Sequence, residues 1–178
     1  MVVGGNELFA GGAFETIGGA VVTSVARWDG TAWGALGAGL GSESSVNALA
    51  WDGSNLWAAG RFTMPGRLAS QAIAKWDGTK WDYLGSEFDG YVYALACDGA
   101  NLYAGGSFGQ VEGQAVKNIA KWDGTKWSPL GSGIDDGVVW ALAWDGQNLF
   151  AGGQFSKAGN ASANGVAKWD GTAWRALG

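Results

Sequence analysis

A Trp-Asp-Gly-Thr segment that returns four times constrains the fold of this chain more than any other feature. The copies start at Trp28, Trp76, Trp122 and Trp169, with spacings of 46 to 48 residues. A Phe lies 14 residues before each of these Trp residues and a second Trp lies five residues after it. These companions are Phe14, Phe62, Phe108 and Phe155, then Trp33, Trp81, Trp127 and Trp174. Such self-similarity predicts a stack of equivalent structural units.

Each copy contains four short apolar runs with turn sequences between them. In the third copy the runs cover residues 91–96, 102–108, 119–122 and 126–130. Asp-Gly steps join the first run to the second and the third to the fourth, and Asp-Gly between apolar runs is a strong hairpin signal. A repeat of 40 to 50 residues with four strands is typical of a propeller blade.

The sequence therefore predicts an all-β fold, a β-propeller with four four-stranded antiparallel blades per chain. We expect a single domain over residues 1–178, with repeats at approximately 1–45, 46–90, 91–137 and 138–178. The 33 Gly and 2 Pro residues suit many tight turns, and an aromatic content of 13% excludes a disordered chain.

The charge of the chain restricts its partners. A net charge of −5 disfavours nucleic acid and anionic membrane surfaces, which both need a basic footprint. No apolar stretch approaches the roughly 20 residues that span a bilayer. We therefore expect no nucleic-acid partner and no membrane partner.

The repeat also resembles known propeller repeats. A Gly pair after the second strand is similar to the kelch repeat, and Val-x-Ala-Leu-Ala before an Asp-Gly turn is similar to the WD repeat. The block Ile-Ala-x-Trp-Asp-Gly-x-x-Trp-x-x-Leu-Gly, at Ile73 and Ile119, resembles repeats of fungal cortical polarity-marker proteins and of uncharacterised bacterial surface proteins. Copies one and four depart from it with Val25 and Val166. The resemblance covers essentially the whole chain; it implies a propeller and favours an extracellular or cell-surface location, but transfers no functional residue.

The first repeat is shorter than the others. Aligned on the shared Phe, Met1 falls opposite Leu49, so we expect a clipped innermost strand in the first blade. Two assemblies remain open: four blades that close on themselves, or two chains that form an eight-bladed ring. Burial of the end blades favours the homodimer. The clipped repeat also fits a trimmed or engineered fragment of a larger propeller.

The composition argues against catalysis. The chain has no His, which removes His-based nucleophilic and acid–base systems and His-ligated metals. The single cysteine, Cys97, stands where other repeats have Trp51 and Trp144, as expected of a strand position. No carboxylate pair breaks the repeat symmetry in the way a glycosidase would require. We therefore predict no enzyme activity and no cofactor.

Acidic residues gather in the connections of variable length, but the repeats share no ligand pattern, so no metal site is predicted. These residues are Glu43, Glu87, Asp89, Asp135 and Asp136. The Asp that follows each repeated Trp is interpreted as a turn residue. These are Asp29, Asp77, Asp123 and Asp170.

The ligand candidates lie outside the repeated Trp pairs, because regular recurrence favours a packing role for those pairs over sugar stacking. Trp140 replaces Asn47 and Tyr93 on the predicted innermost strand, where an aromatic side chain could line a central opening. We select Trp140, Tyr93 and Arg61 as candidate ligand residues. The connections between second and third strands are expected to form much of any ligand face. They span residues 15–24, 63–72, 109–118 and 156–165.

Two functions compete on this basis. The first is a non-catalytic scaffold, or self-assembling repeat module, in which the repeated aromatic residues are buried. The second is a carbohydrate-binding, lectin-like propeller with repeated Trp-lined sites, which needs several exposed aromatic residues beside polar groups.

Overall fold

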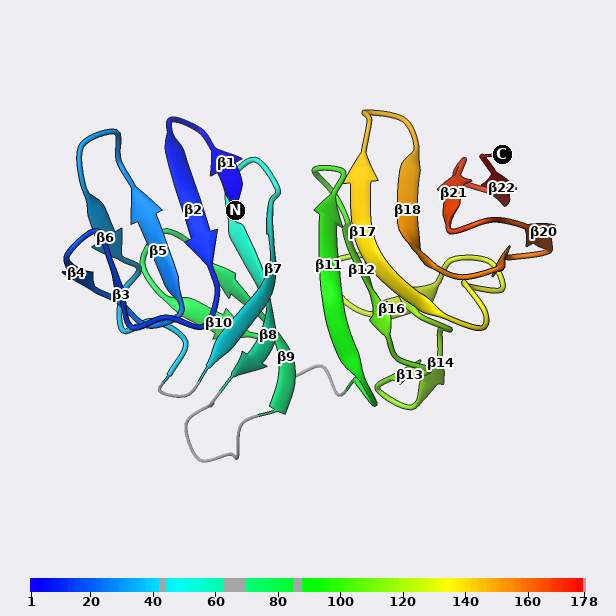
Figure 1. The fold of residues 1–178 in the computed structure, drawn as a ribbon, viewed down its shortest axis with the longest axis horizontal. Helices are drawn as coiled ribbons and strands as arrows, with labels where there is room; N and C mark the ends of the chain where they lie inside the picture. Colours follow the sequence, from blue (N-terminus) through cyan, green and yellow to red (C-terminus); the bar gives the residue numbers. More distant parts are fainter. Residues whose placement is uncertain (42–43, 63–69, 85–87, 178) are drawn as a thin grey trace. The chain divides into compact units, whose positions relative to one another are not determined.

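The computed structural model describes residues 1–41, 44–62, 70–84 and 88–177, with the backbone alone at 70–72. Each repeat forms one four-stranded antiparallel sheet, and we number these sheets blade 1 to blade 4 (Figure 1). The described residues contain strands and turns but no helix, as predicted for an all-β chain, and hence no helix that could cross a membrane.

The strand order within each blade follows the sequence. Blade 1 contains β1 (Val2–Gly4), β2 (Glu7–Gly11), β5 (Val25–Trp28) and β6 (Trp33–Ala35). Blade 2 contains β7 (Ser45–Trp51), β8 (Leu56–Phe62), β9 (Ser70–Trp76) and β10 (Trp81–Tyr83). Blade 3 contains β11 (Tyr91–Cys97), β12 (Leu102–Ser107), β15 (Ile119–Trp122) and β16 (Trp127–Pro129). Blade 4 contains β17 (Val138–Trp144), β18 (Leu149–Gln154), β21 (Val166–Trp169) and β22 (Trp174–Ala176).

The first strand of blade 1 is clipped, as the alignment of Met1 with Leu49 predicts. β1 has 3 residues, whereas β7, β11 and β17 each have 7.

Small hairpins extend the connections between the second and third strands, and sequence analysis missed them. They are β3 (Thr16–Ile17) with β4 (Ala20–Val21), β13 (Gln110–Val111) with β14 (Gln114–Ala115), and β19 (Lys157–Ala158) with β20 (Ala161–Ser162). Strands of two residues give no usable alternation of apolar and polar side chains, so only their turns could have signalled them. In blade 2 most of this connection lies outside the described residues.

A carboxylate closes the turn between the third and fourth strands of every blade. In blade 1, Oδ1 of Asp29 accepts hydrogen bonds from the Thr31 N–H at 2.8 Å, the Thr31 hydroxyl at 2.7 Å and the Ala32 N–H at 2.9 Å. Gly30 adopts a positive φ of 101°, which Gly tolerates without a Cβ clash. The same bonds recur at Asp77, Asp123 and Asp170, which confirms the interpretation as turn residues.

These bonds stabilise the ionised carboxylates. In Asp29 the backbone N–H of Ala32, followed by the hydroxyl and N–H of Thr31, lowers the pKa from 3.8 to about 2. The pKa values of Asp77 and Asp123 are also lowered to about 2 by their equivalent donors. The turn therefore forms locally, from residues within one repeat.

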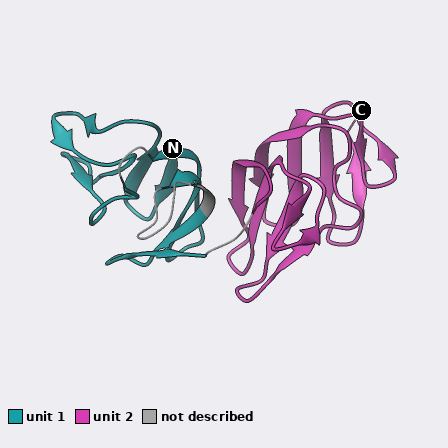
Figure 2. Ribbon diagram, turned by 90° about the horizontal axis from the view of Figure 1, so that it is seen from below, with its two compact units in different colours: residues 1–85 teal, residues 86–178 magenta. Residues whose placement is uncertain are grey.

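The structure divides into two compact units, residues 1–85 with blades 1 and 2 and residues 86–178 with blades 3 and 4 (Figure 2). In unit 1, Phe9, Val25, Val46 and Leu56 belong to one buried cluster. In unit 2 the corresponding cluster contains Ile119, Val139 and Leu149. Each of these cores is built from the facing surfaces of two neighbouring blades.

Glycine on the second strand of a blade forms a socket for the next blade. A Cβ on Gly105 would lie 2.6 Å from Cγ1 of Val139 and 3.2 Å from Cδ1 of Leu142, both on β17. Gly11 in blade 1 meets Val46 and Leu49 of β7 in the same way. The absent side chain therefore lets the first strand of the next blade approach the sheet closely.

Candidate functional site

An extra residue interrupts the ladder between the first and second strands of blades 2, 3 and 4. The pairing skips one residue between Val46 and Ala48, between Val92 and Ala94, and between Val139 and Ala141. The skipped residues are Asn47, Tyr93 and Trp140. A β-bulge of this kind redirects the side chain of the unpaired residue. Two of the three candidate ligand residues therefore occupy a backbone irregularity that the sequence alone did not reveal.

In unit 2 the bulges bring aromatic side chains together across neighbouring blades. The rings of Tyr93 on β11 and Trp140 on β17 have centroids 4.6 Å apart, tilted by 35°. The ring of Tyr91 stacks on that of Tyr93 at 5.9 Å. We call Tyr91, Tyr93 and Trp140 the aromatic row. Tyr91 is 53% exposed and Trp140 is 52% exposed, so the row presents large apolar side chains to solvent.

Sequence analysis found two members of this row and missed the third. Tyr91 lies two residues before Tyr93, and alternation along a strand places such residues on the same side. That spacing could have identified it. Arg61, the third candidate, is an exposed residue of β8 opposite Ser45 in unit 1. It is not a member of the aromatic row, which lies wholly within unit 2.

The repeated Trp pairs form cross-strand contacts, as the sequence suggested. Trp28 pairs with Trp33 in the register of β5 and β6, and their ring centroids are 5.5 Å apart. The other three pairs have separations of 5.5 to 5.6 Å and similar tilts. The indole N–H of Trp81 donates to the Leu36 carbonyl at 3.1 Å, and that of Trp174 donates to the Leu130 carbonyl at 3.0 Å. This uniform geometry, with bonds to the preceding blade, supports a packing role.

The described acidic residues of the variable connections make contacts within the protein. Asp89 accepts hydrogen bonds from the N–H groups of Gly109 and Gln110. Asp135 pairs with Lys117 at 2.7 Å, and Asp136 accepts from the Ser156 hydroxyl at 2.7 Å. Glu43 and Glu87 lie outside the described residues. No group of three metal-binding side chains occurs in the described part of the chain.

In blades 2 and 3, another Asp supports the hairpin between the first and second strands. Oδ2 of Asp98 accepts the hydroxyl of Tyr103 at 2.7 Å and the side-chain amide of Asn101 at 2.8 Å. Burial raises the pKa of Asp98, but these bonds outweigh it and lower the pKa overall. Burial, followed by the bond to Asp98, raises the pKa of Tyr103 well above its usual range. This acid and phenol therefore form a fixed structural pair.

The outward face of blade 4 differs from the equivalent face of blade 3. Within the described part of unit 2, a Cβ on Gly152, the counterpart of Gly105, would meet only Cβ of Ala141 in its own blade, at 3.9 Å. Val166 is 44% exposed, whereas Ile119 at the same position of blade 3 is 0% exposed. Ala141 and Ala143 are exposed, whereas Ala94 and Ala96 are buried. We call this surface, with Ala141, Ala143, Phe150, Gly152 and Val166, the open face.

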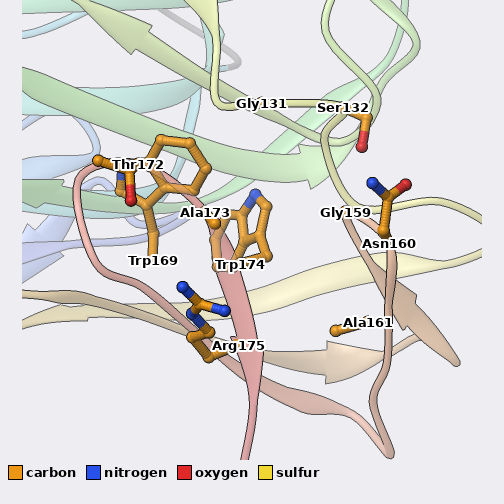
Figure 3. A pocket seen from close by; sticks show the side chains of 10 residues that line it. All are labelled: Gly131, Ser132, Gly159, Asn160, Ala161, Trp169, Thr172, Ala173, Trp174 and Arg175. Carbon is orange, nitrogen blue, oxygen red and sulfur yellow. The ribbon is translucent and has the colours of Figure 1, made fainter.

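A pocket of about 410 Å³ lies at the outer edge of blades 3 and 4 (Figure 3). The Trp169 and Trp174 side chains lie beside Arg175, while Ser132 and Asn160 lie across from them. Ser132 follows blade 3 and Asn160 lies between β19 and β20, so the two blades together supply the lining. Arg175 donates from Nε to Oδ2 of Asp170 at 3.0 Å. The pocket thus combines indole rings with exposed polar groups.

No family model matches this chain, and no curated protein matches it in sequence. Among solved structures, it is similar to the β-propeller domain of the Trilobed protease from Pyrococcus furiosus, which has an open velcro topology. The TM-score is 0.55 at 17% sequence identity, and the match covers 86% of this chain. The chain spans 42% of the length of that structure. Together with the four antiparallel sheets, this likeness shows that the chain has a β-propeller fold.

Proposed function

We propose that this chain is a non-catalytic propeller scaffold that assembles with a second copy of itself through the open face of blade 4. The empty socket at Gly152 is the observation that carries the proposal. The equivalent sockets at Gly11 and Gly105 each accept a Val and a Leu from the next blade. Gly152 keeps the same residue type, and among the described residues of unit 2 only Cβ of Ala141, in its own blade, lies within 4 Å of its virtual Cβ.

Burial at equivalent positions supports the same proposal. In blade 3, Ala96, Tyr103 and Ile119 are 7%, 5% and 0% exposed and share a core cluster with Val139 of blade 4. Their counterparts in blade 4 are Ala143, Phe150 and Val166, all apolar. This composition favours contact of the surface with another blade, because exposure of contiguous apolar side chains to water promotes association.

The occupant we assign to the open face is blade 1 of a second copy. Met1, at the position of Leu49, is 85% exposed, and Val3, at the position of Trp51, is 67% exposed. Blade 1 therefore also presents apolar side chains where blade 2 uses Leu49 to contact the Gly11 socket. If each copy contacts the other twice, a closed two-fold dimer with eight blades results.

The proposal includes the absence of catalysis. The chain contains no His, and the carboxylates Asp29, Asp77, Asp123 and Asp170 serve as acceptors in turns. Lowered pKa values keep these groups ionised and unsuited to donating a proton near neutral pH.

Light scattering on a sizing column tests the assembly. We expect a mass of twice the 18.3 kDa of the chain, falling toward one chain on dilution. Gly152→Leu should fill the empty socket and yield a folded monomer, because the nearest side-chain atom among the described residues, Cβ of Ala141, lies 3.9 Å from the position of the new Cβ. Gly34→Leu is the matched control, because Gly34 lies on strand β6 and a Cβ there would meet no atom of the described residues within 4 Å.

The control should remain a dimer with the same circular dichroism spectrum as the parent chain. A parent chain that runs as a monomer at all concentrations would refute the proposal. So would a Gly152→Leu variant that dimerises like the parent, because the open face would then not be the interface.

A further inference from the structure

Some residues that line the pocket between blades 3 and 4 differ from their counterparts in the other blades, and packing does not require them. Trp169, Thr172 and Trp174 have counterparts in every blade, and their contacts close a turn or anchor one blade on another. Asn160 stands where blades 1 and 3 have Gly19 and Gly113. Packing explains the shared residues but leaves Asn160 without a structural role.

Arg175 also breaks the symmetry. At the position of Arg175 the other blades carry Gly34, Asp82 and Ser128. At the position of Ala173, blades 2 and 3 carry Lys80 and Lys126, whereas blade 1 carries Ala32, so blade 4 shares with blade 1 the small side chain that leaves room beside Trp169. Blade 4 therefore differs from the other described copies by a cation and an amide at the rim of this pocket.

The polar groups of the pocket are available to a ligand. Among the described residues, the Asn160 amide, the Ser132 hydroxyl and the Trp169 indole N–H have no hydrogen-bond partner. Arg175 uses Nε for Asp170, and its side chain is 63% exposed, so its terminal nitrogens face solvent. The pocket thus offers a flat indole surface together with donors and acceptors from separate loops.

We propose that this pocket binds a neutral pyranose unit of a glycan. The C–H face of a pyranose ring suits the partly exposed indole of Trp169, and ring hydroxyls suit the mixed donors and acceptors of Asn160, Ser132 and Arg175. The positive charge of Arg175 is balanced by Asp170 at 3.0 Å, which favours a neutral sugar over an acidic one. The volume of about 410 Å³ lies in the range of small-ligand sites.

Calorimetric titration of the full chain tests this site. The probes are methyl glycosides of glucose, galactose and mannose, their β-linked and α-linked oligosaccharides, and glucuronic acid as the acidic comparison. The variant Asn160→Gly with Arg175→Ser gives blade 4 the residues that blade 3 has at both positions. We expect at least one neutral probe to bind the parent chain and at least a tenfold rise in Kd for this double variant.

Arg27→Ser is the matched control, because Arg27 is also an exposed Arg paired with a carboxylate, Glu7, at 3.0 Å in blade 1. It should bind like the parent. Absence of binding by every neutral probe, binding of glucuronic acid alone, or equal affinity of parent and double variant would overturn the assignment. This outcome is independent of the assembly, since the sizing column measures mass without any sugar present.

Discussion

Blades 3 and 4 have nearly the same sequence pattern and the same strand order, yet equivalent side chains experience different surroundings. Ile119 of blade 3 is fully buried against blade 4, whereas Val166 of blade 4 is 44% exposed. Gly105 accepts Val139 and Leu142, whereas the Gly152 socket is empty. The repeat sequence therefore specifies the side chains on both faces of a blade. Whether a face contributes to the free energy of folding depends on whether a neighbouring blade covers it.

The largest effect should follow truncation at the position of Ile119. Ile119→Ala removes a fully buried side chain between two blades and should lower the free energy of unfolding by about 2–5 kcal/mol. Val166→Ala, at the equivalent exposed position, should lower the free energy of unfolding much less when the protein is dilute. Urea unfolding followed by Trp fluorescence measures both values. Similar losses for the two variants would mean that neighbouring blades do not bury this position as described.

Substitution of the Gly residue in the filled socket should produce the next largest effect. Gly105→Leu forces a side chain against Val139 and Leu142 and should destabilise unit 2 by about 1–3 kcal/mol through overpacking. Gly152→Leu should leave the unfolding midpoint of the dilute monomer nearly unchanged. Thermal and urea midpoints of the two variants compare the filled and the empty socket directly. Equal destabilisation would contradict the distinction between them.

Sequence reasoning recovered those features that each repeat encodes locally. The Asp-Gly turns and fixed Trp spacing predicted four antiparallel sheets, and the offset of Met1 from Leu49 predicted the short β1. The small hairpins were missed because two-residue strands carry no periodicity. The bulges at Tyr93 and Trp140 were missed because an extra residue in all complete copies leaves the alignment unchanged. The pocket to which Ser132 and Asn160 both contribute was also missed. Its lining comes from two blades, and the spacing of residues along the sequence does not show which residues of neighbouring blades lie close together.

The smallest effect should come from the turns, where blades 3 and 4 are alike. The pKa of Asp123 is lowered from 3.8 to about 2, and the pKa of Asp170 is lowered by equivalent bonds and by a further bond from Arg175. A carboxyl with a lowered folded-state pKa contributes stability above pH 3.8 that is lost as the pH falls toward 2. Asp123→Asn and Asp170→Asn should each flatten the decline of the urea midpoint between pH 4 and pH 2, and Asp170→Asn should have the larger of the two small effects because Arg175 also donates to Asp170.

Asp123 is exposed and Asp170 is partly exposed, so solvent screening keeps each contribution small. A steeper change for Asp123→Asn than for Asp170→Asn would show that the neighbouring blade influences even this local turn.

The carboxylate turns have a consequence for how such chains change through gene duplication. Every donor of Asp29 lies within three residues of it, and the indole bonds that cross between blades end on main-chain carbonyls of Leu36 and Leu130. A duplicated or deleted copy therefore keeps its turn bonds, and it meets a main-chain acceptor whichever copy precedes it. Recombination within the gene can thus alter the number of blades without first acquiring compensating substitutions.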